Sequence, residues 1–146
     1  MIIENQIFND AMAKRISAEG FIYRVQIQNP GVVGSVTQFN VQIQNDSDFL
    51  WVATALVSYN AGAIVANPDY LLTVLDTGTG RQLQDGPIHV ANCTGTAQWP
   101  FKLPEPKLCR GGGTLNFQLT DTSGAADLVD IALHGYKVYK LAGFTR

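Results

Sequence analysis

Strict alternation of apolar and polar residues is the sequence feature that most constrains the fold of this chain. It is clearest over residues 114–120, where Leu115, Phe117 and Leu119 are separated by polar residues. Successive side chains of a β-strand point to opposite faces of a sheet, so a period of two predicts a strand with one buried and one exposed face. The alternation therefore predicts a β protein.

The same pattern recurs along the chain between turn-forming residues. Residues 21–28 and 37–44 both place glutamine or asparagine at the outward positions, and we expect these two strands to share an amide-rich outer face. Residues 49–59 are almost continuously apolar, which favours a central strand, with a buried helix as the alternative. Further strands are predicted at residues 70–75, 81–84, 88–90, 95–97, 114–120 and 128–140, the last with a bulge at Gly135.

Two segments do not follow the alternation. Residues 4–19 resemble a helix only weakly, and we expect residues 1–19 to form an N-terminal arm. Residues 98–108 contain three prolines, which lack the amide hydrogen that a β-ladder needs, so an extended surface loop is expected there.

Seven or eight strands at intervals of about 8 to 12 residues predict one antiparallel β-sandwich over residues 20–146, with jelly-roll or related Greek-key connectivity. The class is therefore all-β. The expected core consists of inward residues of the strands: Val25, Ile27, Phe39, Val41, Ile43, Trp51, Leu72, Val74, Leu115, Phe117, Leu119, Ile131 and Leu133.

Charge and composition disfavour several kinds of partner. Ten basic and twelve acidic residues give a net charge of −2, which leaves no basic surplus for nucleic acid. No apolar stretch approaches the roughly 20 residues of a membrane-spanning helix, and the first residues do not have the pattern of a cleaved secretion signal. Charged residues make up only 15%, so amide side chains cover much of the surface, which suits contact with other proteins.

The chemically active side chains form no convincing catalytic or metal-binding pattern. Cys93 and Cys109 lack the spacing of a zinc site, and two reduced thiols are expected, with a disulfide as the alternative. Asp76 begins an Asp-Thr-Gly sequence typical of aspartic proteases, but the second copy at Asp121 contains an inserted residue, which favours a hairpin turn.

The remaining candidates also have simple structural explanations. His89 and His134 lie in strand-like segments without the neighbours of a catalytic histidine. Four aspartates in turns, Asp46, Asp48, Asp69 and Asp76, lack the spacing of a calcium loop. We therefore expect no enzymatic activity, no catalytic residues, no cofactor and no bound metal.

Large apolar residues in the two irregular segments need to be covered, because exposing one costs about 1.5 to 3 kcal/mol. Trp51 lies in a core strand, whereas Trp99 is expected at an interface, as a lid on the core, or as a platform for a sugar. We expect at least one irregular segment to dock on another protein, the alternative being that both cap the ends of the sandwich. The predicted interface residues are Ile3, Ile7, Phe8, Met12, Trp99, Phe101 and Leu103, with Phe8 and Trp99 as anchors.

Three sequence segments carry a resemblance to a known family. They are Ile-Gln-Asn-Asp-Ser-Asp-Phe-Leu-Trp at 43–51, Leu-Leu-Thr-Val-Leu-Asp at 71–76 followed by Gly80-Arg81, and His-Gly-Tyr-Lys-Val-Tyr at 134–139. In this order they resemble the small β-sandwich virion proteins of tailed bacteriophages, especially the jelly-roll cement or decoration proteins of the capsid.

This resemblance implies a structural virion protein, made in the host cytoplasm, that binds the outer capsid surface and stabilises the head by bridging neighbouring subunits. Its partners would be the major capsid protein and other copies of itself, as a homodimer or homotrimer, without nucleic acid or membrane. The alternative is a carbohydrate- or receptor-binding β-sandwich module of a phage tail or accessory domain.

Overall fold

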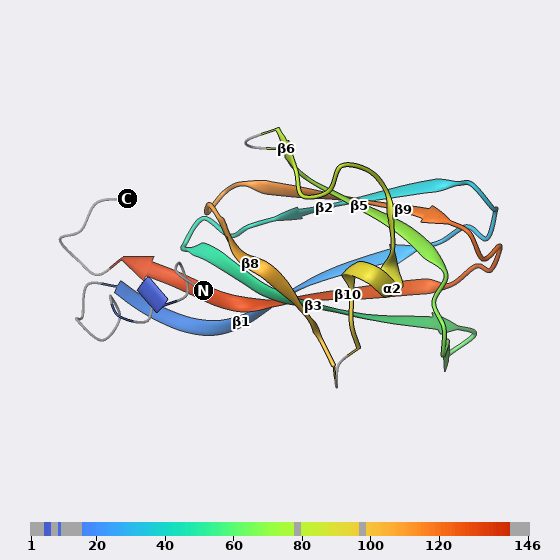
Figure 1. Cartoon of the computed structure of the whole chain (residues 1–146), viewed down its shortest axis with the longest axis horizontal. Helices are drawn as coiled ribbons and strands as arrows, with labels where there is room; N and C mark the ends of the chain where they lie inside the picture. The colour runs from blue at the N-terminus through green and yellow to red at the C-terminus, as the bar shows by residue number, and fades with distance from the viewer. Residues whose placement is uncertain (1–4, 7–8, 10–15, 78–79, 97–98, 141–146) are drawn as a thin grey trace.

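The computed structural model describes residues 5–6, 9, 16–77, 80–96 and 99–140. Two antiparallel sheets pack face to face and form the two layers of Figure 1, which confirms the predicted all-β sandwich. The first sheet contains β1 (Ile16–Gln28), β10 (Leu128–Lys140), β3 (Asp48–Asn60), β4 (Ala63–Ile64) and β8 (Phe101–Cys109). The second contains β2 (Val36–Gln42), β9 (Thr114–Asp121), β5 (Tyr70–Asp76), β6 (Arg81–Gln82) and β7 (Ile88–His89). A four-residue helix, α2 (Val90–Cys93), follows β7.

The strands pair in a nested order. β1 pairs with β10, β2 with β9, β3 with β8 and β5 with β7, so the first half of the chain meets the second half in reverse. β10 also pairs with β3, and β9 with β5, which completes the two sheets. Four strands wound against four others in this way form the connectivity of a jelly roll. The predicted jelly-roll arrangement is thus observed.

The continuously apolar segment and the predicted bulge both match the structure. β3 is a central strand, because it pairs with β10 on one side and with β8 on the other. The side chains on both of its faces are mostly buried or half-buried, which explains the continuously apolar sequence. The register between β10 and β3 shifts between His134 and Gly135. A Cβ atom on Gly135 would lie 1.9 Å from the carbonyl oxygen of Leu50, so only glycine permits this close approach.

The proline-rich segment is a strand, and the prediction of an extended loop there was wrong. β8 pairs along the edge of β3, but the register shifts between Lys102 opposite Ala53 and Lys107 opposite Trp51. Pro104 and Pro106 lie within this irregular part of β8. Prolines are tolerated at edges and bulges, where no ladder hydrogen bond is lost.

Three further predictions need correction. β1 begins at Ile16, so residues 16–19 belong to the sandwich and not to the expected arm. β1 and β2 lie in different sheets and do not share an outer face; the outward amides of β2 instead contact those of β9. Residues 95–97 form no strand in their described part, where Gly95 makes only an isolated bridge to Ala55.

The core lies between the two sheets and contains twelve of the thirteen predicted residues. Phe39 is the exception, because it belongs to edge strand β2 and remains 37% exposed. Its cross-strand partner on β9, Phe117, is fully buried and contacts Trp51. Position in the sheet, and not the alternation, separates these two phenylalanines.

This difference predicts the cost of two matched substitutions. Phe117→Ala should lower the free energy of unfolding by about 3 to 5 kcal/mol, since it removes a fully buried ring and leaves a cavity. Phe39→Ala should cost less than half as much, because its ring is already in contact with water. Urea denaturation of both variants measures the difference, and equal losses would contradict the assigned register.

Candidate docking surface

Trp99 is the most exposed large hydrophobic residue of the described chain, at 81%. It lies between α2 and β8, in a segment whose described parts extend away from both layers at the lower edge of Figure 1. This exposure rules out the expected role as a lid on the core. The alternatives that remain are an interface anchor and a sugar platform.

The base of this segment is fixed by hydrogen bonds that hold the backbone of Gly95 and of Trp99. Gly95 is bound to the edge of β3 by two hydrogen bonds: its amide donates to the carbonyl oxygen of Thr54 (3.1 Å), and its carbonyl accepts from the amide of Leu56 (2.7 Å). Across the turn, the Thr96 amide donates to the Trp99 carbonyl and the Trp99 amide donates to Thr96 Oγ1. A Cβ on Gly95 would lie 2.0 Å from the Trp99 carbonyl oxygen, so this position requires glycine.

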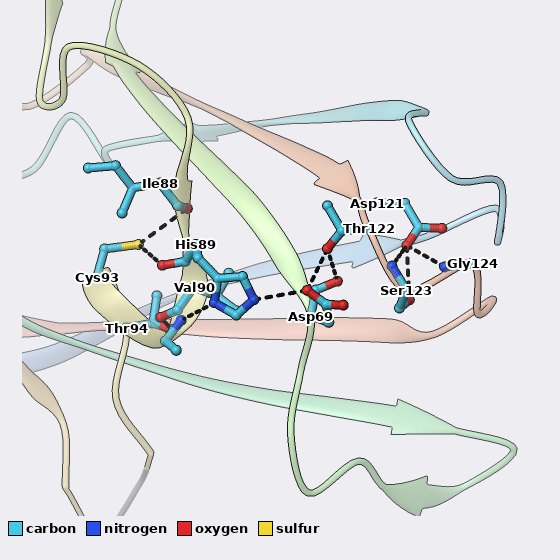
Figure 2. A network of polar contacts seen from close by, with 11 residues as sticks. Asp69, Ile88, His89, Val90, Cys93, Thr94, Asp121, Thr122, Ser123 and Gly124 are labelled. Carbon is cyan, nitrogen blue, oxygen red and sulfur yellow. Dashed lines mark hydrogen bonds and ion pairs between the residues drawn. The ribbon is translucent and has the colours of Figure 1, made fainter.

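A polar network secures the preceding helix (Figure 2). His89 Nε2 lies 2.9 Å from Asp69 Oδ1, and Thr122 Oγ1 donates to the same oxygen over 2.6 Å. The Ala91 amide donates to His89 Nδ1, so a neutral His89 carries its proton on Nε2 and donates it to Asp69. The network thereby joins β7 and α2 to the start of β5 and the end of β9.

Asp69 is the charged centre of this network. Hydrogen bonds from Thr122 and then from His89 hold the pKa of the Asp69 carboxyl below its ordinary value of 3.8. After α2, the Thr94 hydroxyl donates to the Val90 carbonyl oxygen over 2.7 Å, and Gly95 follows directly. The contacts run without interruption from Asp69 to the base of the Trp99 turn.

A hollow of about 330 Å³ adjoins this network. Its lining includes the polar side chains of Asn67, His89, Thr94 and Thr96 together with apolar Leu56 and Val90. Both ring nitrogens of His89 already bond to Asp69 and Ala91, whereas the amide of Asn67 and the hydroxyl groups of Thr94 and Thr96 can bind hydroxyl-bearing ligands by hydrogen bonds. This combination is compatible with sugar binding.

Three of the seven predicted interface residues, Trp99, Phe101 and Leu103, lie in the described part of the chain, and they differ in exposure. Phe101 is half-buried at the start of β8, and Leu103 packs against the core, so both are parts of a strand. Four others lie outside the described residues: Ile3, Ile7, Phe8 and Met12. Of the predicted residues that the structure describes, Trp99 is the exposed one. Trp51 is buried, as predicted, and its indole donates to Thr54 Oγ1.

The arrangement of the aspartates contradicts the protease signature. Asp121 lies opposite Tyr70 at the start of β5, whereas Asp76 is the last residue of that strand, opposite Leu115. The two carboxylates are therefore at opposite ends of the β5–β9 pair, roughly 20 Å apart at 3.3 Å per residue. They cannot share a proton.

The other reactive side chains have local partners. Three of the aspartates in turns face separate partners: Asp46 pairs with Lys137, Asp69 with His89 and Asp76 with Lys107. Within the described residues, no group of three or more His, Cys, Asp or Glu could hold a metal ion, and no helix could span a membrane.

Cys93 and Cys109 are free thiols, and burial raises their pKa values to about 11 and about 12.

The fold and the site define an all-β jelly-roll sandwich that presents an exposed tryptophan. No protein-family model matches the chain, and no curated protein matches it. Among solved structures, it is similar to dimeric latent PorU from Porphyromonas gingivalis, with a TM-score of 0.40, 9% identity and coverage of 87% of this chain and 13% of that one. It is also similar to the VP2 subviral particle of infectious bursal disease virus, with a TM-score of 0.34, 14% identity and coverage of 85% and 32%. The chain thus spans less than a third of either protein, and TM-scores below 0.5 carry no inference about its function.

Sequence reasoning missed the His89–Asp69–Thr122 network. These residues are distant along the chain, at the ends of three different strands, and only the β5–β7 and β5–β9 pairings bring them together. The Asn-Pro-Asp turn at 67–69 was a visible signal for a structured turn, but it did not indicate a partner.

The lowered pKa of Asp69 predicts how acid affects the protein. A carboxylate whose pKa is lowered by folding contributes stability that is present above its ordinary value of 3.8 and is lost as the pH falls through the lower folded value. As the pH falls below 3.8, the free energy of unfolding should therefore decrease less in Asp69→Ala than in the wild-type protein. At neutral pH, hydrogen exchange at the Ala91 amide should be faster in this variant. Exposed Asp85→Ala is the control, and an unchanged decline in Asp69→Ala would refute the role of the network.

Proposed function

We propose that this chain is a non-enzymatic structural virion protein that binds the outer capsid surface and stabilises the head by bridging neighbouring capsid subunits. Its partners in this role are the major capsid protein and further copies of itself, and its location is the virion. The observation that carries the proposal is Trp99, an exposed indole on a turn whose backbone is held by hydrogen bonds.

An exposed aromatic side chain on a hydrogen-bonded backbone supports binding for an energetic reason. Tryptophan is enriched among the residues that dominate protein interfaces, because it fills a pocket and buries a large apolar area. A residue whose backbone is already held in place loses less conformational entropy on binding. Trp99 is 81% exposed, and its backbone amide and carbonyl are both hydrogen-bonded to Thr96.

The outer face of the second sheet supports contact between copies of the chain. The outward positions of the described strands β2, β9 and β5 carry no charged side chain. Asn116 Nδ2 donates to Asn40 Oδ1 over 2.7 Å, and Gln118 Nε2 donates to Asn116 Oδ1 over 3.0 Å. Because these amides already bond one another, covering this face removes no ion from water.

A sugar- or receptor-binding module is the second candidate. The same exposed indole can stack on a sugar ring, and the neighbouring hollow provides Asn67, Thr94 and Thr96 for hydroxyl groups. Jelly rolls occur both in viral capsids and in lectins, so the fold does not separate the candidates.

Particle binding by a Trp99 variant tests the first candidate. Trp99→Ala should weaken cosedimentation with assembled phage capsids at least about tenfold, in line with the loss expected for an interface anchor. Its free energy of unfolding should change by no more than about 0.5 kcal/mol, because the side chain is exposed. Val33→Ala, at a residue 68% exposed, is the matched control and should bind normally.

The outcomes separate the two functions. Wild-type protein that does not bind capsids but binds glycans, with binding lost in Trp99→Ala, would replace the capsid proposal with the sugar-binding one. Capsid binding that is equal in wild type and Trp99→Ala would exclude Trp99 as the anchor.

Self-association is a separate expectation. Light scattering should give a mass two or three times the chain mass of 15.8 kDa at micromolar concentration. Gln118→Lys places a charge on the uncharged face and should yield monomers, whereas Gln26→Lys on the outer face of the other sheet should not. A clean monomer for the wild-type protein would count against the expected homodimer or homotrimer.

A further inference from the structure

A second hollow, of about 340 Å³, lies at a different part of the sandwich. It is lined by the end of β8, the turn that follows, and residues of β5, β6 and β9. β1 and β2 contact each other at one edge of the sandwich, while β8 and β6 are at the far end of their respective sheets. The lining also includes Ile43, which directly follows β2.

Its charge contrasts with that of the whole chain. Lys107, Arg81 and Arg110 line the hollow together with one acidic residue, Asp76. Three of the chain's ten basic residues therefore meet at one hollow, although the net charge of the chain is −2. The local excess of two positive charges favours an anion.

Contacts around the hollow hold the Lys107 side chain and the backbone that follows Arg110. Lys107 Nζ lies 3.2 Å from Asp76 Oδ2, and the two side chains are only 20% and 14% exposed. The backbone after Arg110 is held as well: the Gly111 amide donates to Asp48 Oδ1, and the Gly112 amide donates to the Ile43 carbonyl oxygen. A partly buried ion pair is screened less by water than an exposed one, so this charge pattern persists in solution.

The remaining lining is mainly apolar, with Gly113 and the polar residue Thr114 beside the apolar side chains. Ile43, Cys109 and Leu115 each have at most 3% exposure, and Leu108 remains 43% exposed. Guanidinium groups bind carboxylate and phosphate oxygens through paired hydrogen bonds, which lysine cannot reproduce. A small group with two or three oxygens suits a hollow of this size, which has basic side chains and an apolar floor.

We propose that this hollow is a binding site for a compact oxyanion, a carboxylate or phosphate group, held by Arg81 and Arg110 with Lys107 as the third cation. Asp76 positions Lys107 and limits the excess charge. The site does not depend on capsid binding, and it shares no described lining residue with the hollow near His89. The group belongs either to a free anion or to an acidic side chain of a protein.

Calorimetric titration of the full chain at low ionic strength tests the site with two probes, inorganic phosphate and a short peptide of aspartate and glutamate. The wild-type protein should bind at least one of them. Arg81→Gln and Arg110→Gln should each weaken that binding at least about tenfold, the effect expected for one charge-assisted hydrogen bond. Both arginines are exposed, so the variants should keep the circular dichroism of the wild-type protein.

Arg24→Gln is the matched control, because Arg24 is an exposed arginine of β1 outside the hollow. Phosphate binding that is lost in the two variants supports the site with a free anion as ligand. Binding of the peptide alone, lost in the same variants, supports the site with a protein side chain as ligand. Absence of binding to both probes, or equal weakening by Arg24→Gln, would overturn the proposal.

Discussion

The pairing of β10 with both β1 and β3 is the constraint on which the rest of the structure depends. Along β1 the register runs unbroken from Ile16 opposite Lys140 to Gln28 opposite Leu128, so the two ends of the described sandwich meet. Val25 on β1 and Ile131 and Leu133 on β10 are fully buried in this pairing. Inside this outermost pair, the inner strands also pair in reverse order, β2 with β9 and β3 with β8. Such distant pairings cost loop-closure entropy before they contribute contacts, so we expect slow folding.

The jelly-roll connectivity also determines where the two candidate sites lie. β8 belongs to the first sheet, while its neighbours in sequence, β7 and β9, belong to the second. The chain therefore crosses between the sheets on both sides of β8. The crossing before β8 carries Trp99, and the crossing after it carries Arg110. Residues at such crossings lie outside the β-ladders, so their side chains can face a partner.

The sequence patterns predicted the structural features that depend on neighbouring residues. They failed for features that depend on which distant strands pair with each other. Alternation placed the core positions of β9 and β10, and the bulge at Gly135 was visible as a glycine within a strand. Phe39 has the same pattern as Phe117, but only the sheet order reveals that β2 is an edge. The prolines of β8 correctly excluded a central strand, yet an edge strand with an irregular register accommodates them. Trp99 was recognised from its proline-rich surroundings, whereas the basic hollow joins residues from separate strands and had no local signal.

The spacing of the two sites bears on how partners can bind. Phe101 lies opposite Thr54 and Cys109 opposite Phe49, so the ends of β8 are separated by five residues of β3, or roughly 17 Å. Trp99 and Arg110 lie just beyond these ends. A standard protein interface covers about 800 Å² of each partner, which corresponds to a patch about 30 Å across. One protein partner of ordinary size is therefore large enough to contact the indole and place an acidic side chain in the basic hollow. In that arrangement Trp99 would contribute apolar burial and Arg81 and Arg110 would fix the orientation, because charged contacts at an interface set register more than affinity.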